Sequence, residues 1–344
     1  MSKKPIICFT QPIDRYFGWQ IHLYIESCIQ AGFDEDRIHV LMYVPKNRDR
    51  NMDLWNRIQA VHPKVKFFFY EDQGVQQYLG LYIPILRPHC LWQHFQAFPE
   101  LSKETILYTD CDILWVEGLD IAKYFDDDIC YISDAKSYLN ASYFNSKIKD
   151  VLPDKLEEYK TRDILKEVCD IVGIDKQIAV DNNDNTGGVQ YVLKGIDAAF
   201  WKKVEKDVIS IRRHLLDVNK QFFENESKGI QSWCADLWTI LYNLWYHNKE
   251  VKVVKEMEFS WVHDPLSKLE TVKIYHNAGA TGEFTPIGNT KYPVFYKGKY
   301  HRGEDPTLDP HLQDVLTHPE TKKHCTWYYA SKLNELKLKY NLKY

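Results

Sequence analysis

Two aspartates separated by one residue, Asp110 and Asp112, stand at the end of an apolar segment. Both carboxylates can reach one hard cation, and Mn²⁺ or Mg²⁺ prefers carboxylate and phosphate oxygens to softer ligands. The chain is apolar on both sides, over 106–108 and 113–115, and charges in such a run are costly unless they are paired or metal-bound. The Asp110-Cys111-Asp112 triplet therefore predicts a site for a divalent cation that can bridge two phosphates. Two solvated acids in a loop would give the same sequence pattern.

The elements that must position this triplet alternate along the first 115 residues. The hydrophobic patterns predict strands at 5–10, 38–44, 65–70 and 105–109, and helices at 16–31, 55–61 and 87–98. This alternation predicts an α/β fold with a Rossmann-like, mostly parallel central sheet and flanking helices. Ligands of such sheets bind beyond the carboxyl ends of the strands, where the triplet lies. Thr10 is a candidate contact at the end of the first strand, and Gln11 and Asp14, just after it, stand where this architecture contacts a base and ribose.

The rest of the chain is less regular. Residues 135–180 are polar and largely helical, which suggests an insertion or lid, and strands are predicted at 189–193, 251–254 and 272–275. Helices are predicted at 233–246 and 328–340, and residues 277–312, rich in Gly, Pro, Thr and Tyr, form an expected functional loop region. We expect one domain with a nucleotide-binding half at 1–115, an acceptor-binding and metal-completing half at 116–312, and a helical tail at 313–344.

Composition narrows the function classes. The net charge is -4, so the chain as a whole has no electrostatic footprint for nucleic acid. Its eight cysteines include no Cys-x-x-Cys pair, which favours buried reduced thiols and a cytoplasmic location, the host cytoplasm for a phage or viral protein. No apolar run approaches a membrane span, and no Gly-x-Gly-x-x-Gly or P-loop motif is present. A nucleotidyltransferase would carry a Gly-rich first loop, whereas residues 11–15 contain no Gly.

The triplet and its flanks resemble the Asp-x-Asp strand of GT-A glycosyltransferases. Three later segments, 186–192, 233–237 and 274–279, resemble in the same order elements of the retaining enzymes of the glycogenin and galactinol-synthase kind. Order and spacing agree over about residues 100–280, and the first 100 residues agree in architecture only. Two positions depart from the family pattern. Thr186 stands where the family usually has Asn, and the Gln that neighbours the family's helix-opening acid is missing beside Asp236.

The resemblance implies a GT-A fold with a small antiparallel acceptor-side sheet, and Mn²⁺ or Mg²⁺ held by Asp110, Asp112 and His276. A lone histidine is more often structural, and Asp236 at a helix start also suits the helix dipole. The implied donor is a nucleoside-diphosphate sugar, with a UDP-sugar favoured, transferred with retention of configuration. Asp236, Asp184 and Asn185 are the implied catalytic or sugar-contacting residues. The remaining candidate donor contacts are Arg87, Thr109, Cys111, Gly187, Gly188, Trp233, Gly279 and Lys297, although Lys291 and Lys299 are open alternatives to Lys297 as the diphosphate contact.

Some alternatives stay open at this point. Arg87 suits a surface salt bridge as well as a diphosphate contact, and the polar run 181–185 also suits turn chemistry. The acceptor can be a glycan, a small molecule, a protein or modified DNA, as in phage enzymes that glycosylate or arabinosylate 5-hydroxymethylcytosine. A DNA acceptor requires a positive face. The acids also suit a non-catalytic metal- or sugar-binding module, and the oligomeric state is not predicted. Basic residues able to form the positive face are Lys203, Lys206, Arg212, Arg213, Lys332, Lys337 and Lys339.

Overall fold

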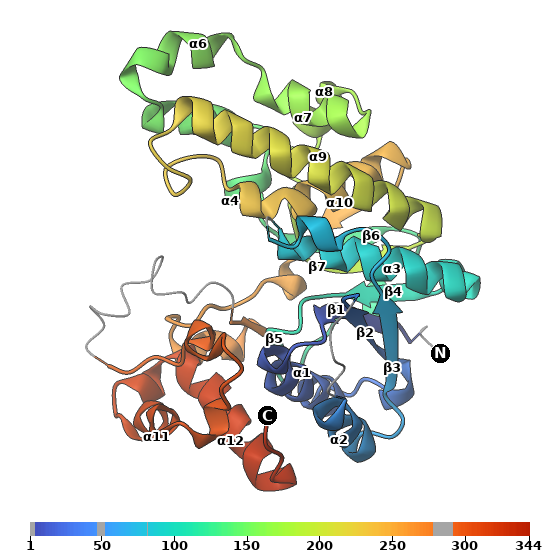
Figure 1. Cartoon of the computed structure of the whole chain (residues 1–344), viewed down its shortest axis with the longest axis vertical. Helices are drawn as coiled ribbons and strands as arrows, with labels where there is room; N and C mark the ends of the chain where they lie inside the picture. The colour runs from blue at the N-terminus through green and yellow to red at the C-terminus, as the bar shows by residue number, and fades with distance from the viewer. Residues whose placement is uncertain (1–3, 47–51, 81, 278–291) are drawn as a thin grey trace. The chain divides into compact units, whose positions relative to one another are not determined.

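A computed structural model describes residues 4–46, 52–80, 82–277 and 292–344 (Figure 1). Its contacts divide the chain into two compact units. Unit 1 comprises Met1–Glu71, Tyr108–Phe125 and Glu256–Tyr344, and unit 2 comprises Asp72–Leu107 and Asp126–Lys255. These units follow other bounds than the predicted functional halves, whose roles stay a prediction.

Unit 1 contains three parallel strands in the order β3-β2-β1. They are β1 (Ile6–Pro12), β2 (Ile38–Val44) and β3 (Lys66–Glu71), and Cys8 of β1 lies in register with His39 of β2. Every residue of β2 is buried, as expected of a continuous apolar run inside a parallel sheet. Helices α1 (Gly18–Gln30) and α2 (Asp53–Val61) complete this βαβαβ segment.

Unit 1 also contains a short antiparallel pair and the C-terminal helices. Strand β5 (Ile113–Trp115) pairs with β9 (Ile274–His276), in a register that sets Ile113 opposite His276. Helix α12 (Cys325–Tyr340) packs against α1 and against α11 (Pro310–Thr317). The two strands of this pair come from distant parts of the chain, so the pairing brings those parts to one place.

Unit 2 contains four strands in the order β4-β7-β6-β8. They are β4 (Thr105–Tyr108), whose last residue belongs to unit 1, β7 (Gly187–Lys194), β6 (Cys130–Asp134) and β8 (Val251–Val253). Strand β6 runs antiparallel to β7, with a register shift between Ile132 and Asp134, and parallel to β8.

The long helix α9 (Ala198–Phe222) organises the helical layer of unit 2. Helices α3 (Leu86–Ala97), α7 (Ile164–Val172) and α10 (Ala235–Tyr246) each pack against it, as Figure 1 shows. Asp197 caps α9 by accepting a hydrogen bond from Phe200 N–H at 2.8 Å. The chain between β6 and β7 also forms four shorter helices: α4 (Lys136–Leu139), α5 (Tyr143–Ser146), α6 (Leu156–Thr161) and α8 (Lys176–Asp181).

The predicted fold class is confirmed. The seven strands, three in unit 1 and four in unit 2, are mostly parallel, helices flank them, and β5 and β9 form the small antiparallel sheet. All eight cysteines are free and all but Cys234 are buried, as predicted. Within the described part of the chain, no helix combines the length and apolar character that a membrane crossing requires.

Candidate metal centre

Asp110, Asp112 and His276 meet in unit 1. Each offers one ligand atom, and the three atoms lie within 4.8 Å of one another. The β5–β9 ladder produces this arrangement, because Ile113 pairs with His276 and the backbone N–H of Asn277 donates to the carbonyl of Asp112 at 2.8 Å. The predicted ligands are therefore brought together by backbone pairing.

Two of these ligand atoms are buried without a hydrogen-bond partner among the described residues. They are Oδ1 of Asp112 and Nε2 of His276, which lie 3.3 Å apart. Nearly all buried polar atoms in proteins are hydrogen-bonded, so such atoms call for an explanation. A divalent cation supplies one, since two carboxylates and one imidazole form an oxygen-rich donor set that suits Mn²⁺ and, less closely, Mg²⁺.

The other oxygen of Asp112 is held by Lys297. The Lys297 amino group donates a hydrogen bond to Oδ2 and forms an ion pair with it. Burial opposes ionisation of Asp112, but the charges of Lys297 and His276 outweigh it and hold the pKa of Asp112 well below its usual range. Burial also disfavours the charged form of Lys297, yet Asp112 raises the pKa of its amino group. The pair is therefore charged at neutral pH.

The predicted base and ribose contacts lie at the end of β1, in the same unit. Gln11 hydrogen-bonds the thiol of Cys111, and it thereby counteracts part of the rise in thiol pKa caused by burial and by the neighbouring aspartates. The Thr10 hydroxyl is buried without a partner among the described residues. Asp14 accepts from the backbone N–H of Tyr16 at 3.0 Å, so it caps the turn that follows. Gln11 thus adjoins the triplet directly.

Sequence reasoning missed Tyr16. Burial raises the pKa of its hydroxyl, and the charges of Lys297 and Asp112 act on it as well, so the hydroxyl lies near the candidate metal ligand Asp112. Its place after Asp14 in the loop that follows the first strand was the available signal. The hydroxyl of Thr109, a predicted donor contact, lies 2.6 Å from the Tyr24 hydroxyl, and a role in donor binding stays a prediction.

Two aromatic side chains missed from the sequence cover His276. The indole of Trp261 is nearly parallel to the imidazole, with ring centroids 5.6 Å apart and an interplanar angle of 17°. Phe259 meets the same imidazole edge-on at 5.1 Å. No local pattern links residues 259–261 to His276, because their proximity arises from the bridge between Ser260 and Tyr275.

Asp236, Arg87 and Trp233 lie together in unit 2. Arg87 donates to Oδ2 of Asp236 and pairs with it, and the Tyr82 hydroxyl lies 2.7 Å from Oδ1. The Tyr82 hydroxyl also lies 2.7 Å from the Trp233 carbonyl oxygen, and Tyr82 meets the half-exposed Trp233 ring edge-on. Both oxygens of Asp236 are thus engaged, with only 2% of the residue exposed. The Arg87 salt bridge is observed, and a substrate role for either residue stays a prediction.

Gly187 and Gly188 also have a reason inside unit 2 to be glycine. A Cβ on Gly187 would lie 2.0 Å from the Ser133 carbonyl oxygen, and one on Gly188 would lie 2.7 Å from the Tyr191 hydroxyl. The next residue, Val189, has a φ of 77°, which is strained for a β-branched side chain. Among the other predicted contacts, Asp184 is exposed, Asn185 closes a turn by donating to Asn182 O at 2.8 Å, and Gly279 lies outside the described residues.

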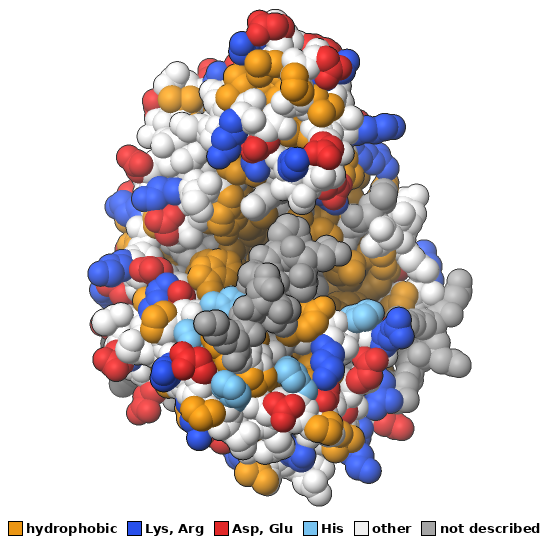
Figure 2. Space-filling model, turned by 90° about the vertical axis from the view of Figure 1, so that its left-hand side faces the viewer, with side chains coloured by type: hydrophobic (Ala, Val, Ile, Leu, Met, Phe, Trp, Pro, Cys, Tyr) orange, Lys and Arg blue, Asp and Glu red, His pale blue; other side chains and the backbone are white. Residues whose placement is uncertain are grey.

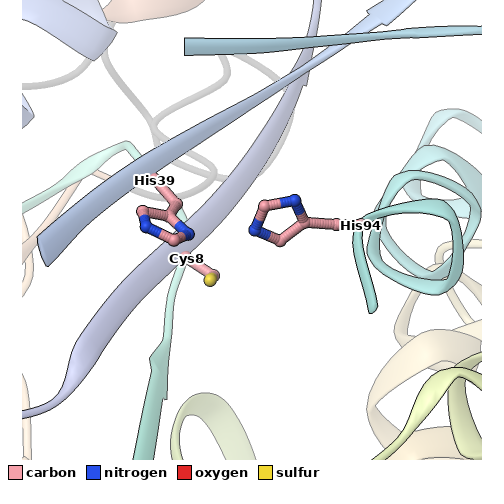
Figure 3. Close-up of side chains that lie close together, drawn as sticks. All are labelled: Cys8, His39 and His94. Atoms are coloured by element: carbon pink, nitrogen blue, oxygen red, sulfur yellow. The ribbon is translucent and has the colours of Figure 1, made fainter. Parts of the chain in front are cut away.

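Figure 3 labels three further buried side chains: Cys8 and His39 on adjoining strands of unit 1, and His94 on α3 of unit 2. Burial raises the pKa of the Cys8 thiol, and burial lowers the pKa of His94 to about 3. Cys8 and His94 are therefore uncharged near neutral pH, each within its own unit, as expected of core residues.

No protein-family model matches the chain, and no curated protein matches it in sequence. Among solved structures, it is similar to the bifunctional glycosyltransferase WbbM (TM-score 0.42, 12% identity), covering 97% of this chain and 52% of that one. It is also similar to the galactosyltransferase LgtC solved with donor and acceptor sugar analogues (TM-score 0.42, 11% identity; 97% and 95% covered). Mouse xyloside xylosyltransferase 1 is a third (TM-score 0.37, 10% identity; 79% and 97% covered). With TM-scores below 0.5, these similarities assign neither a substrate nor a reaction to this chain.

Proposed function

We propose that the protein is a divalent-metal-dependent glycosyltransferase of the GT-A type. It transfers a sugar from a nucleoside-diphosphate sugar, with a UDP-sugar favoured, to an acceptor hydroxyl. One observation carries the proposal: Asp110, Asp112 and His276 converge, and buried ligand atoms of Asp112 and His276, neither of which has a hydrogen-bond partner among the described residues, lie 3.3 Å apart. Three converging ligand atoms can hold a cation. Without a cation, burying such polar atoms lowers the stability of the fold.

The side chains divide the work as follows. Asp110, Asp112 and His276 would hold Mn²⁺ or Mg²⁺, which would supply positive charge against the charge that develops on the diphosphate leaving group. Lys297 adds a second positive charge at the same carboxylate, and its pairing with Asp112 keeps both groups ionised. Gln11, Tyr16 and Asp14 line the end of β1, where the nucleoside is expected. This arrangement supports preorganised electrostatic stabilisation of the departing nucleotide.

Retention of configuration is the favoured outcome. An inverting enzyme needs a carboxylate free to take the acceptor proton, and Asp236 is the candidate that the sequence offers. Its two oxygens are instead engaged by Arg87 and Tyr82, and only 2% of the residue is exposed. These contacts suit a positioning role better than that of a general base.

The charge distribution disfavours DNA as the acceptor. Positive and negative side chains are interspersed over the face shown in Figure 2. Several basic residues named for a DNA-binding face have partners: Lys203 pairs with Asp207 and Lys339 pairs with Glu26, while Arg212 is 7% exposed. A glycan, a small molecule or a protein acceptor is therefore preferred.

The test combines nucleotide binding with turnover. Thermal unfolding is followed with UDP, GDP and CMP, each with and without Mn²⁺, and hydrolysis of the matching sugar nucleotides is then measured. At a hundredfold excess over Kd, a ligand stabilises the native state by about 2.7 kcal/mol, so we expect a Tm rise of about 3 °C or more with UDP and Mn²⁺ together.

Two variants accompany this test. Asp110→Asn removes one ligand oxygen without touching the Lys297 pair, and it should abolish both the Mn²⁺-dependent shift and hydrolysis. The matched control, Asp120→Asn, changes an exposed acid of the same unit and should behave like the wild type. Absence of any nucleotide shift would refute the proposal, whereas binding without hydrolysis or transfer would indicate a non-catalytic module.

A further inference from the structure

A half-exposed tryptophan, Trp261, lies directly against His276. Its indole stacks on the imidazole at an angle of 17°, yet 42% of the residue remains exposed. His276 itself is 4% exposed, so the tryptophan lies between a buried metal-ligand candidate and solvent. Large aromatic side chains bury most of their surface when nothing else uses it, and an exposed indole beside a ligand cluster therefore has a candidate use in recognition.

The indole is held in place by its own backbone and by the strand next to it. The backbone N–H of Trp261 donates to Oδ2 of Asp264 at 2.7 Å, and the Lys268 amino group donates to the same oxygen at 2.9 Å. Ser260 pairs with β9 on both sides, since its N–H donates to Ile274 O at 2.8 Å and its carbonyl accepts from His276 N–H at 2.9 Å. Trp261 is therefore fixed next to His276 before any ligand arrives, which lowers the entropic cost of using it as a contact surface.

The residues around the triplet separate into two sets. Gln11 contacts Cys111, and Tyr16 lies within the electrostatic influence of Lys297 and Asp112. Trp261 and Phe259 contact His276 instead. A nucleoside diphosphate sugar has a nucleoside at one end of its diphosphate and a sugar at the other. With the nucleoside expected at Gln11 and Tyr16, the group next to His276 is the sugar.

The chemistry of the indole agrees with this assignment. A sugar ring presents C–H groups on its faces and hydroxyls around its edge, so it can cover a flat aromatic surface while its hydroxyls stay hydrated. We infer that Trp261 is the platform on which the sugar ring of the donor stacks, next to the metal-ligand cluster. This inference rests on the proposed function and adds a sugar-binding residue to it.

Calorimetric titration of two ligand classes, each with Mn²⁺, tests the platform. UDP reports the diphosphate and nucleoside contacts, and a panel of UDP-glucose, UDP-galactose, UDP-N-acetylglucosamine and UDP-xylose reports the sugar contact. Trp261→Ala should weaken the tightest sugar nucleotide by about tenfold and leave UDP within about twofold. Trp261→Phe, which keeps a flat ring, should recover most of the loss. The control Tyr246→Ala removes an aromatic side chain that is 45% exposed in unit 2 and should change neither affinity.

Electron paramagnetic resonance of Mn²⁺ without nucleotide separates a sugar contact from an effect on His276. The platform requires unchanged Mn²⁺ affinity in Trp261→Ala. Equal weakening of UDP and sugar nucleotide, weaker Mn²⁺ binding, or no change in either ligand would each overturn it, as would a wild type that binds no sugar nucleotide more tightly than UDP. If wild type binds no nucleoside diphosphate at all, the proposed function itself fails, and the platform fails with it.

Discussion

Under the proposed function, Asp112 has two cationic partners, Lys297 and a divalent metal ion. Its Oδ2 is bonded to Lys297, and its Oδ1 is directed to the same place as His276 Nε2. Under the proposed function, the lysine and a divalent cation would therefore compete electrostatically for one carboxylate, while both would attract a diphosphate. Opposite effects on metal and nucleotide binding follow from this geometry, because a single charge has opposite signs of interaction with the two ligands.

Lys297→Met removes the positive charge of the lysine and keeps a long side chain of similar length. Without nucleotide, Mn²⁺ should bind about tenfold more tightly because the competing cation is gone, whereas UDP with saturating Mn²⁺ should bind about tenfold more weakly. The first affinity is measured by electron paramagnetic resonance and the second by calorimetry. Lys299→Met serves as control, since Lys299 lies in the same turn but pairs with Asp309 and is 45% exposed. Weaker Mn²⁺ binding in Lys297→Met would contradict the competition.

At the scale of elements, the start of β7 lies so close to the backbone of β6 that it requires glycine. Gly187 faces the Ser133 carbonyl of β6 at the register shift between the two strands, and Val189 follows with a left-handed φ of 77°. Strain of this kind persists where surrounding structure enforces it. A side chain at Gly187 or Gly188, the first two residues of β7, would therefore require neighbouring atoms to move.

Gly187→Ala should lower the free energy of unfolding by about 1–3 kcal/mol or more, because the new Cβ would meet the Ser133 carbonyl oxygen at 2.0 Å. Gly80→Ala is the matched control: a Cβ there meets nothing within 4 Å, and the expected change is within about 0.5 kcal/mol. Urea unfolding followed by circular dichroism measures both. A neutral Gly187→Ala would show that β7 adjusts at no cost.

Elements with a continuous apolar run were predictable, and elements whose apolar pattern is weak or diluted by charged residues were not. The apolar run 38–44 predicts a buried strand, and β2 spans those residues. The three-residue strand β5 has no periodicity of its own and forms because β9 pairs with it. Helix α9 was also missed, since its apolar positions are diluted by charged residues on the outer face. Residues 164–172, read as part of an insertion or lid, bury five residues in a helix that packs on α9 and α10.

The candidate site shows the same division. The Asp110-Cys111-Asp112 triplet and His276 carry local signals, because charges interrupt apolar runs and a histidine precedes a turn. Trp261 carries none, since it lies beside His276 only through a tertiary contact, and the one signal for Tyr16 is its place in the loop after the first strand. Pair contacts between distant segments are the information that composition and periodicity lack.

At the scale of the whole molecule, buried histidines couple stability to pH. Burial, with the charges of His62 and Lys339, lowers the pKa of His22 to about 3, and burial lowers the pKa of His94 to about 3. In the unfolded chain a histidine titrates near pH 6.5, so below that pH the unfolded state binds more protons than the folded state. The stabilising effect is therefore complete above about pH 6.5 and falls progressively toward about pH 3.

The free energy of unfolding should accordingly decrease on acidification from pH 7.5 to 5, with each such histidine contributing up to about 1.4 kcal/mol per pH unit. His22→Gln removes one of them, so its stability should vary less steeply with pH even though the variant is less stable at pH 7.5. His301→Gln, at an exposed position, is the control and should keep the wild-type slope. Urea unfolding at several pH values decides, and equal slopes for both variants would refute the coupling.

The pairing of β5 with β9 has a consequence for how the protein is made. Asp110 and Asp112 emerge from the ribosome well before His276, and only the paired strands bring them together. A nascent chain that has not reached residue 276 therefore has no complete chelating centre. A divalent ion that binds the finished fold and not its precursors stabilises the former by mass action. Under the proposed function, the three-residue ladder would therefore confine metal binding to chains that are synthesised beyond residue 276 and folded.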